Sequence, residues 1–306
     1  MESGRARSMV VSDLPNHQRT YSEPNGAAGP SEPAFPQYRP ISAELALAPS
    51  VSVVIPVKNE AANLPHVFLA IPDWIDEVVL VDGRSTDDTL EVALRLRPDI
   101  KVVSQKGAGK GDALLAGFAA CSGDIIVAMD GDGSTHGSEI IHFVSALVAG
   151  ADLVKGSRFA SGGRSDDITV GRRCGNRLLL TLVNRMYGTR YSDLCYGYNA
   201  FWSRHLNALG MECDGFEVET LMSIRAAKAG LRIHEVPSHE RPRLNGTSNL
   251  RAIKDGWRIL RVILREKFRR PNPFIPKYPA AAGVGYLEPV RIAAADAKTD
   301  VDLESL

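Results

Sequence analysis

The sequence lacks the features that mark membrane-spanning, secreted or disulfide-bonded proteins. No apolar run reaches the roughly 18 residues that a transmembrane helix needs, and the first residues have no apolar signal-peptide core. The four cysteines show no CxxC spacing, so we expect reduced, structural thiols and no zinc site. These absences predict a cytoplasmic protein.

A surplus of charge of one sign is missing as well. The 306 residues include 36 basic and 36 acidic side chains, and the net charge of zero gives no reason to expect nucleic-acid binding. A hydrophobic content of 44% is ordinary for a globular protein. The length suffices for one large domain or two small ones.

Two common nucleotide-binding motifs are also absent. The loop at residues 106–112 follows a strand-like run and opens a helix-like one, and its glycines would let backbone N–H groups approach a phosphate. Its third glycine is misplaced for a dinucleotide fingerprint, and no Ser or Thr follows the Gly-Lys pair at the P-loop spacing. The loop therefore predicts either a nucleotide contact or a plain loop–helix junction.

What the chain does have is an alternation of strand-like and helix-like segments that begins near Ser50. Apolar runs predict four strands, at residues 51–56, 77–81, 100–104 and 125–129. Such alternation is typical of an α/β fold with a doubly wound, mostly parallel sheet and helices on both faces.

The composition divides the chain into four parts. Residues 1–48 are rich in Pro, Ser, Gly and Asn and predict a disordered arm. Residues 49–250 predict the α/β domain, 251–270 a long basic helix, and 271–306 an irregular tail.

Two acidic motifs each follow the end of a predicted strand. Asp130 and Asp132, loosened by Gly131, can face one hard cation, and Mg²⁺ or Mn²⁺ is commonly shared between carboxylates and substrate phosphates. The alternative is a solvated turn. Asp82 ends a second strand, and ligands of open α/β sheets bind outside the carboxyl ends of the strands. Together these acids predict one metal–diphosphate crevice.

Polar residues near these strand ends extend the candidate site. Asp82 would accept a hydrogen bond from a nucleobase or ribose, or simply form a turn. Asn59 and Glu60 follow the first strand and could contribute to the same pocket, although Glu60 could instead charge a helix start.

Two later segments add charged candidates. Arg241 and Arg243, followed by Ser248, form an anion clamp or a solvated basic loop, because guanidinium groups pair bidentately with phosphate oxygens. Glu217 and Glu219 begin a predicted helix, where a carboxylate serves as a general base or only complements the helix dipole.

Residues 251–270 predict an amphipathic helix with a basic face. Its apolar positions recur at helical spacing, at Ile253, Trp257, Leu260, Leu264 and Phe268. Only two acids, Asp255 and Glu266, oppose eight cations on the other face. This pattern indicates a helix on a membrane surface; the alternative is a terminal helix that packs on the core and keeps a solvated face.

Together these features resemble the family 2 glycosyltransferases of GT-A fold, over about residues 50–250. The resemblance rests on segments in the order and spacing of the family, at residues 51–60, 81–87, 109–111, 130–133, 156–159 and 235–248. The branch that the chain resembles is that of the polyprenyl (dolichyl) phosphate sugar synthases.

The resemblance implies a metal-dependent, inverting transferase that uses a nucleotide-diphosphate sugar. It assigns nucleotide-sugar binding to Pro56, Asn59, Glu60, Asp82, Lys110, Asp130 and Arg158. It assigns Mg²⁺ or Mn²⁺ to Asp130 and Asp132, and phosphate binding to Arg241, Arg243 and Ser248. The catalytic candidates are Asp132, Glu217 and Glu219.

The sequence leaves the acceptor open. A polyprenyl phosphate is already anionic and needs no strong base, whereas a saccharide or other hydroxyl acceptor needs a carboxylate to take its proton. For the lipid acceptor, we expect the helix at 251–270 to contact the inner face of the plasma membrane. Outside the enzymes, a nucleotide-sugar-binding regulator with a dead site is the alternative.

Overall fold

The structure is a computed structural model that describes residues 48–247 and 250–269. Apart from Ala48, the predicted arm at 1–48 and the predicted tail at 271–306 lie outside the described residues. Every helix and strand named below lies within the described ranges.

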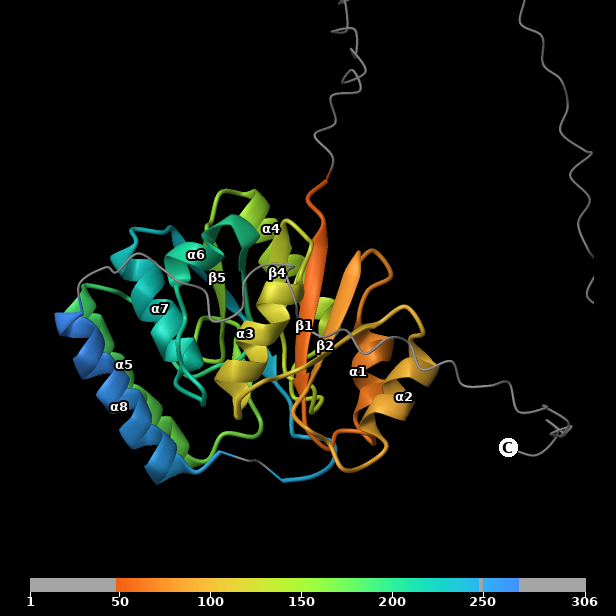
Figure 1. Ribbon diagram of the computed structural model, residues 1–306. Coiled ribbons are helices and arrows are strands. Elements are labelled where there is room, and N and C mark those ends of the chain that lie inside the picture. Colours follow the sequence, from red (N-terminus) through yellow and green to blue (C-terminus); the bar gives the residue numbers. More distant parts are fainter. Residues whose placement is uncertain (1–47, 248–249, 270–306) are drawn as a thin grey trace, which may run out of the picture. The chain divides into compact units, whose positions relative to one another are not determined.

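A seven-stranded sheet forms the centre of the domain, in the order β3-β2-β1-β4-β7-β5-β8 (Figure 1). The strands are β1 (Val51–Val57), β2 (Glu77–Asp82), β3 (Lys101–Ser104), β4 (Ile125–Ala128), β5 (Leu153–Ser157), β7 (Asn199–Trp202) and β8 (Ile233–Pro237). Only β7 runs antiparallel, to both of its neighbours β4 and β5. The predicted α/β class with a mostly parallel sheet is therefore confirmed.

Helices cover both faces of this sheet because successive strand residues point to opposite sides. Val53 and Ile55 face a core shared with α1 (Leu64–Ala70), α2 (Thr89–Leu96) and α4 (Ile140–Val148). Val54 faces the other core, which is shared with α3 (Lys110–Ala120), α6 (Leu206–Leu209) and α7 (Val218–Lys228). Two 3₁₀ turns precede α4 and α6, at Gly137–Glu139 and Ser203–His205.

A third apolar cluster joins α5 (Val170–Tyr187) and α8 (Ala252–Phe268) to α7. It contains Val183, Ile224, Ile259 and Ile263. The helix predicted at 251–270 thus exists with slightly shorter bounds, and it packs through residues other than the predicted apolar stripe. No helix in the described ranges combines the length and the apolar character needed to span a bilayer.

A small two-stranded sheet of β6 (Arg164–Ser165) and β9 (His239–Glu240) was not predicted. Its strands are two residues long, too short to show a period of two. They lie next to β5 and β8 in the chain and continue the pairing of those two strands beyond the sheet.

Two helical glycines offer a matched test of this packing. A Cβ on Gly117 in α3 would lie 2.4 Å from Val54 Cγ1 and 2.8 Å from Val81 Cγ2, whereas one on Gly175 in α5 would meet nothing within 4 Å. We expect Gly117→Ala to lower the free energy of unfolding by about 1–3 kcal/mol through overpacking. Gly175→Ala should raise it by up to about 1 kcal/mol through helix propensity. Urea denaturation measures both, and equal stabilisation by the two changes would contradict the packing of α3.

Candidate functional site

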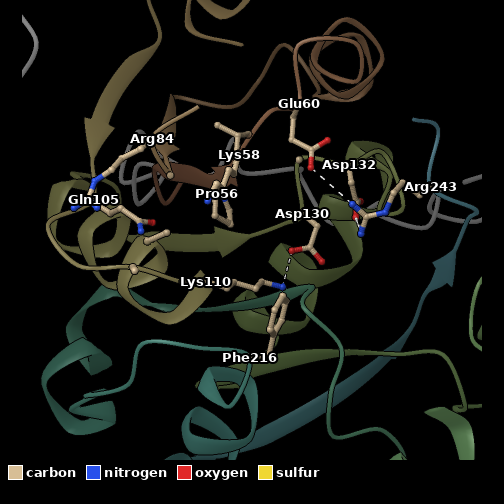
Figure 2. Close-up of a pocket in the computed structure, with 16 residues that line it drawn as sticks. Pro56, Lys58, Glu60, Arg84, Gln105, Lys110, Asp130, Asp132, Phe216 and Arg243 are labelled. Atoms are coloured by element: carbon tan, nitrogen blue, oxygen red, sulfur yellow. Dashed lines mark ion pairs between the residues drawn. The ribbon is translucent and has the colours of Figure 1, made fainter. Parts of the chain in front are cut away.

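A cavity of about 370 Å³ lies beyond the carboxyl ends of β1, β2 and β4 (Figure 2). Six of the residues predicted for the site line it: Pro56, Glu60, Lys110, Asp130, Asp132 and Arg243. The edge of a parallel sheet thus brings them together from four separate segments, as expected for open α/β sheets.

Asp130 and Asp132 follow β4 directly and present their carboxylates to the cavity. Gly131 separates them where a Cβ would lie 2.6 Å from Val57 Cγ1, so the turn passes too close to β1 for a side chain. Asp132 is fixed because its Oδ1 accepts a hydrogen bond from the Ser134 N–H at 2.9 Å. The local sequence therefore holds both acids at the end of the strand.

Lys110 is the central cation of the cavity. Its Nζ lies 2.6 Å from Asp130 Oδ1 and 2.9 Å from Glu219 Oε1. Burial by itself would lower the pKa of this ammonium group, but the charges of Asp130 and Glu219 outweigh that effect and hold the pKa well above its usual value. Lys110 therefore stays charged throughout the physiological pH range.

Arg243 reaches the cavity from the segment after β9. Its Nη2 lies 2.7 Å from Asp132 Oδ2, and its Nη1 lies 3.8 Å from Glu60 Oε1. Burial raises the pKa of Glu60, and the nearby charge of Asp132 raises it further against the opposing effects of Asn63 and Arg243. The two cations, Lys110 and Arg243, thus hold the three lining carboxylates in place.

The two aspartates suit a divalent cation that is shared with a substrate. In the described residues no cluster of three or more His, Cys, Asp or Glu side chains could hold a metal ion unaided. Mg²⁺ is commonly held by one or two carboxylates plus substrate phosphates. Asp130 and Asp132, which come from one strand end and face one cavity, supply such a pair, so the residues fit a metal–diphosphate.

The glycine loop lines the cavity, but its glycines serve another purpose. A Cβ on Gly109, which has φ +91°, would lie 2.2 Å from the Asp214 carbonyl oxygen, and one on Gly111 would lie 2.6 Å from the Cys213 oxygen. The Gly111 N–H donates to the Asp214 oxygen at 3.0 Å. The glycines thus allow close backbone packing, and the group that this loop extends into the cavity is the Lys110 side chain.

Asn59 and Asp82 are not among the lining residues, although both lie close to them in the chain. The Asp82 carboxylate accepts a hydrogen bond from the Ser85 N–H at 3.1 Å, and Asn59 Oδ1 accepts one from the Thr86 N–H at 2.7 Å. Both side chains form turns that support the loops after β1 and β2. Asp82 thus forms a turn, and its contact with a nucleobase or ribose stays a prediction.

The structure places Arg158 outside the cavity. Its guanidinium group binds Asp193 at 2.7 Å and Glu240 at 3.0 Å. The exposed fractions of the three side chains are 3%, 0% and 9%. Arg158 thus belongs to a buried ionic cluster that ties β5 to β9, and its contact with substrate phosphates stays a prediction.

The remaining predicted residues also lie off the lining. Glu219 is held by Lys110, and Glu217 lies 3.9 Å from Arg258 on α8. Arg241 donates its backbone N–H to the Ser134 oxygen and exposes its side chain. Ser248 lies outside the described residues.

The lining residues that were not predicted include Lys58, Arg84, Gln105 and Phe216. The first three follow β1, β2 and β3, so the rule that ligands bind beyond strand ends could have found them. Arg84 also donates to the Lys106 carbonyl oxygen at 3.0 Å and so links two of these loops. Phe216 comes from the loop before α7 and directly precedes the predicted candidate Glu217, but its own apolar side chain gave no signal of binding.

Comparisons with known proteins agree with this geometry. A family model described as glycosyl transferase family 2 matches residues 52–210. Over 235 residues the chain is 33% identical to glycosyltransferase AglJ of Haloferax volcanii, a match that covers 75% of this chain and 74% of that protein. Over 224 residues it is 30% identical to dolichol-phosphate mannosyltransferase of Pyrococcus furiosus, covering 70% of this chain but only 63% of that protein.

Solved structures show the same fold. Glucosyl-3-phosphoglycerate synthase from Mycobacterium tuberculosis, in complex with Mn²⁺, UDP and glucosyl-3-phosphoglycerate, matches with a TM-score of 0.58 and 26% identity. That match covers 73% of this chain and 82% of the synthase. A complex of the same synthase with Mg²⁺ and UDP matches with a TM-score of 0.58 and 25% identity, covering 73% of this chain and 81% of the synthase.

Arg158 either stabilises the buried ionic cluster or binds substrate phosphates, and its removal has a different effect in each case. Arg158→Met would leave Asp193 and Glu240 buried without their cation, so we expect the free energy of unfolding to fall by about 3–5 kcal/mol. Arg95→Met, which removes an exposed partner of Glu91, is the control and should change it little. Thermal and urea denaturation measure both. A stable Arg158→Met protein that loses only sugar-nucleotide binding would instead show that Arg158 binds substrate phosphates.

Proposed function

This chain belongs to glycosyl transferase family 2, and we propose that within it the protein is a metal-dependent, inverting enzyme with a lipid acceptor. The donor is a nucleotide-diphosphate sugar, and the acceptor is a polyprenyl phosphate. The reaction is a single displacement: an acceptor oxygen attacks the anomeric carbon from the face opposite the leaving diphosphate, which inverts that centre.

The cavity supports the donor half of the proposal. Four cationic side chains line it, Lys58, Arg84, Lys110 and Arg243, and a diphosphate leaving group develops negative charge as it departs. A divalent cation on Asp130 and Asp132 would neutralise part of that charge. The mycobacterial synthase that matches this fold holds Mn²⁺ or Mg²⁺ together with UDP, which supports the same arrangement here.

The observation that favours a phosphate acceptor is the position of the two candidate bases. Glu219 is committed to Lys110, and neither it nor Glu217 lines the cavity. A hydroxyl acceptor must lose a proton to a base in the transition state, whereas a phosphate monoester is already an anionic nucleophile. The name of the Pyrococcus relative, dolichol-phosphate mannosyltransferase, points to the same class of acceptor.

A soluble hydroxyl acceptor is the second candidate. The mycobacterial synthase has also been solved with phosphoglyceric acid, UDP and Mn²⁺, so the matching fold accommodates a small acceptor. On this alternative the base would be sought among the lining carboxylates. Glu60, with its raised pKa, would be the first residue to substitute.

The lipid acceptor also gives the basic helix a role. A polyprenyl phosphate keeps its hydrocarbon chain in a bilayer, so the enzyme has to work at that surface. Contact of residues 251–270 with the inner face of the plasma membrane is therefore part of the proposal.

Turnover of a panel of UDP- and GDP-sugars, each with and without polyprenyl phosphate, tests the function. We expect product only when the lipid is present together with a divalent cation, Mg²⁺ or Mn²⁺. NMR of the product should show an inverted anomeric configuration. Asp132→Asn should lower kcat/KM at least ~100-fold, because charge on the leaving group is no longer balanced. Asp99→Asn, a change at an acid 76% exposed, is the control.

Two results would overturn parts of this proposal. Product formed without the lipid would move the acceptor to a hydroxyl compound. Failure to bind any sugar nucleotide would remove the donor assignment.

A further inference from the structure

Helix α8 has two apolar faces, and only one of them is covered by protein in the described structure. Ile259 and Ile263 pack in the cluster with α5 and α7, and Val262 packs in the core beneath α7. On the other side of the helix, Ile253 and Trp257 are 82% and 67% exposed. The residues that hold α8 on the domain are therefore different from those that it exposes to solvent.

The exposed stripe runs the length of the helix. Its members are Ile253, Trp257, Leu264 and Phe268, at the spacing of one helical face. Phe268, at the C-terminal end, is 85% exposed. Large apolar side chains exposed in a continuous row indicate a binding surface, whereas scattered single ones do not.

Basic residues gather around this stripe. Helix α8 carries Lys254, Arg258, Arg261, Arg265 and Lys267. Its two acids, Asp255 and Glu266, are 6% and 1% exposed and lie 3.9 Å from Arg258 and Arg265. Two acids therefore oppose five exposed cations on this helix.

Helix α5, which lies beside α8, adds positive charge of its own (Figure 1). The hydroxyl of Tyr187 donates to the Ile263 oxygen at 2.6 Å, and Lys267 Nζ donates to the Met186 oxygen at 2.9 Å, so the two helices are tied together. Residues 170–187 contain four arginines and no acidic residue. The pair of helices is thus strongly basic although the chain as a whole has no net charge.

We propose that the outward face of α8, flanked by α5, docks on the surface of an anionic lipid bilayer. Tryptophan and phenylalanine side chains enter the headgroup boundary, and lysine and arginine pair with lipid phosphates. Each basic residue near an anionic surface strengthens binding roughly five-fold. A protein partner would have to match both the apolar row and the surrounding cations, and charge complementarity favours the lipid.

The docking face is connected to the cavity. A Cβ on Gly215 would lie 2.8 Å from Arg258 Nη1, so α8 touches the loop that carries the lining residue Phe216. Arg251, at the start of α8, follows the lining residue Arg243 by eight positions. Docking would therefore hold this side of the cavity next to the bilayer. The purpose of docking rests on the proposed lipid acceptor, but docking itself requires neither donor nor acceptor.

Co-sedimentation of the full chain with vesicles that lack polyprenyl phosphate tests the inference. We expect binding to vesicles of phosphatidylcholine with about one third phosphatidylglycerol, much weaker binding to phosphatidylcholine alone, and loss of binding at high salt. The double variant Trp257→Ala/Arg261→Glu should bind at least ten-fold more weakly. Its matched control, Trp74→Ala/Arg95→Glu, removes an exposed tryptophan and an exposed arginine elsewhere and should bind like the wild type.

The outcomes separate docking from other uses of this face. Binding that is equal for both double variants, or equal for neutral and anionic vesicles, would overturn the inference. So would a wild-type dimer in light scattering that dissociates in Trp257→Ala/Arg261→Glu and does not bind vesicles, because a second copy would then cover the face. Circular dichroism checks that both variants fold. Vesicle binding without glycosyl transfer would keep the docking face and remove only the proposed acceptor.

Discussion

The ion triplet of Asp130, Lys110 and Glu219 is the constraint on which the cavity depends. Its members come from the end of β4, the start of α3 and the first turn of α7. One buried ammonium group thus joins the consecutive elements α3 and β4 to a helix much later in the chain. Removing Lys110 would leave two carboxylates without their shared cation, and Glu219 is only 5% exposed, which is costly in a protein interior. The position of Asp130 is thereby set before a ligand binds, as preorganised electrostatic sites require.

The antiparallel strand β7 completes this arrangement. It enters the sheet between β4 and β5, and the loop before it passes so close to the triplet that a Cβ on Gly197 would lie 2.5 Å from Lys110 Nζ. The following chain then returns through α7, which supplies Glu219. The strand that departs from the parallel pattern is thus preceded by a loop that packs against the ion triplet.

Much of this was predictable because it depends on local pattern. Apolar runs gave the strands, and the rule that ligands bind at strand ends found Asp130, Asp132 and Glu60. The partner of a charged side chain was not predictable in this way. Arg158 stands at the end of β5 like a ligand-binding residue, but its partners Asp193 and Glu240 lie 35 and 82 positions away. No local signal shows that such acids will meet the guanidinium group.

The same limit explains why the sequence left two alternatives for the basic helix. A stripe at 253, 257, 264 and 268 and a second set at 259, 262 and 263 both recur at helical spacing, and periodicity alone does not show which one a domain will cover. The structure covers the second set and leaves the first in solvent, so the helix is both packed on the core and amphipathic toward its surroundings. A net charge of zero argues against long-range attraction to polyanions only when the charges are evenly spread. Here two buried acids, Asp255 and Glu266, oppose five exposed cations of α8, and this local excess gives a neutral chain one basic surface.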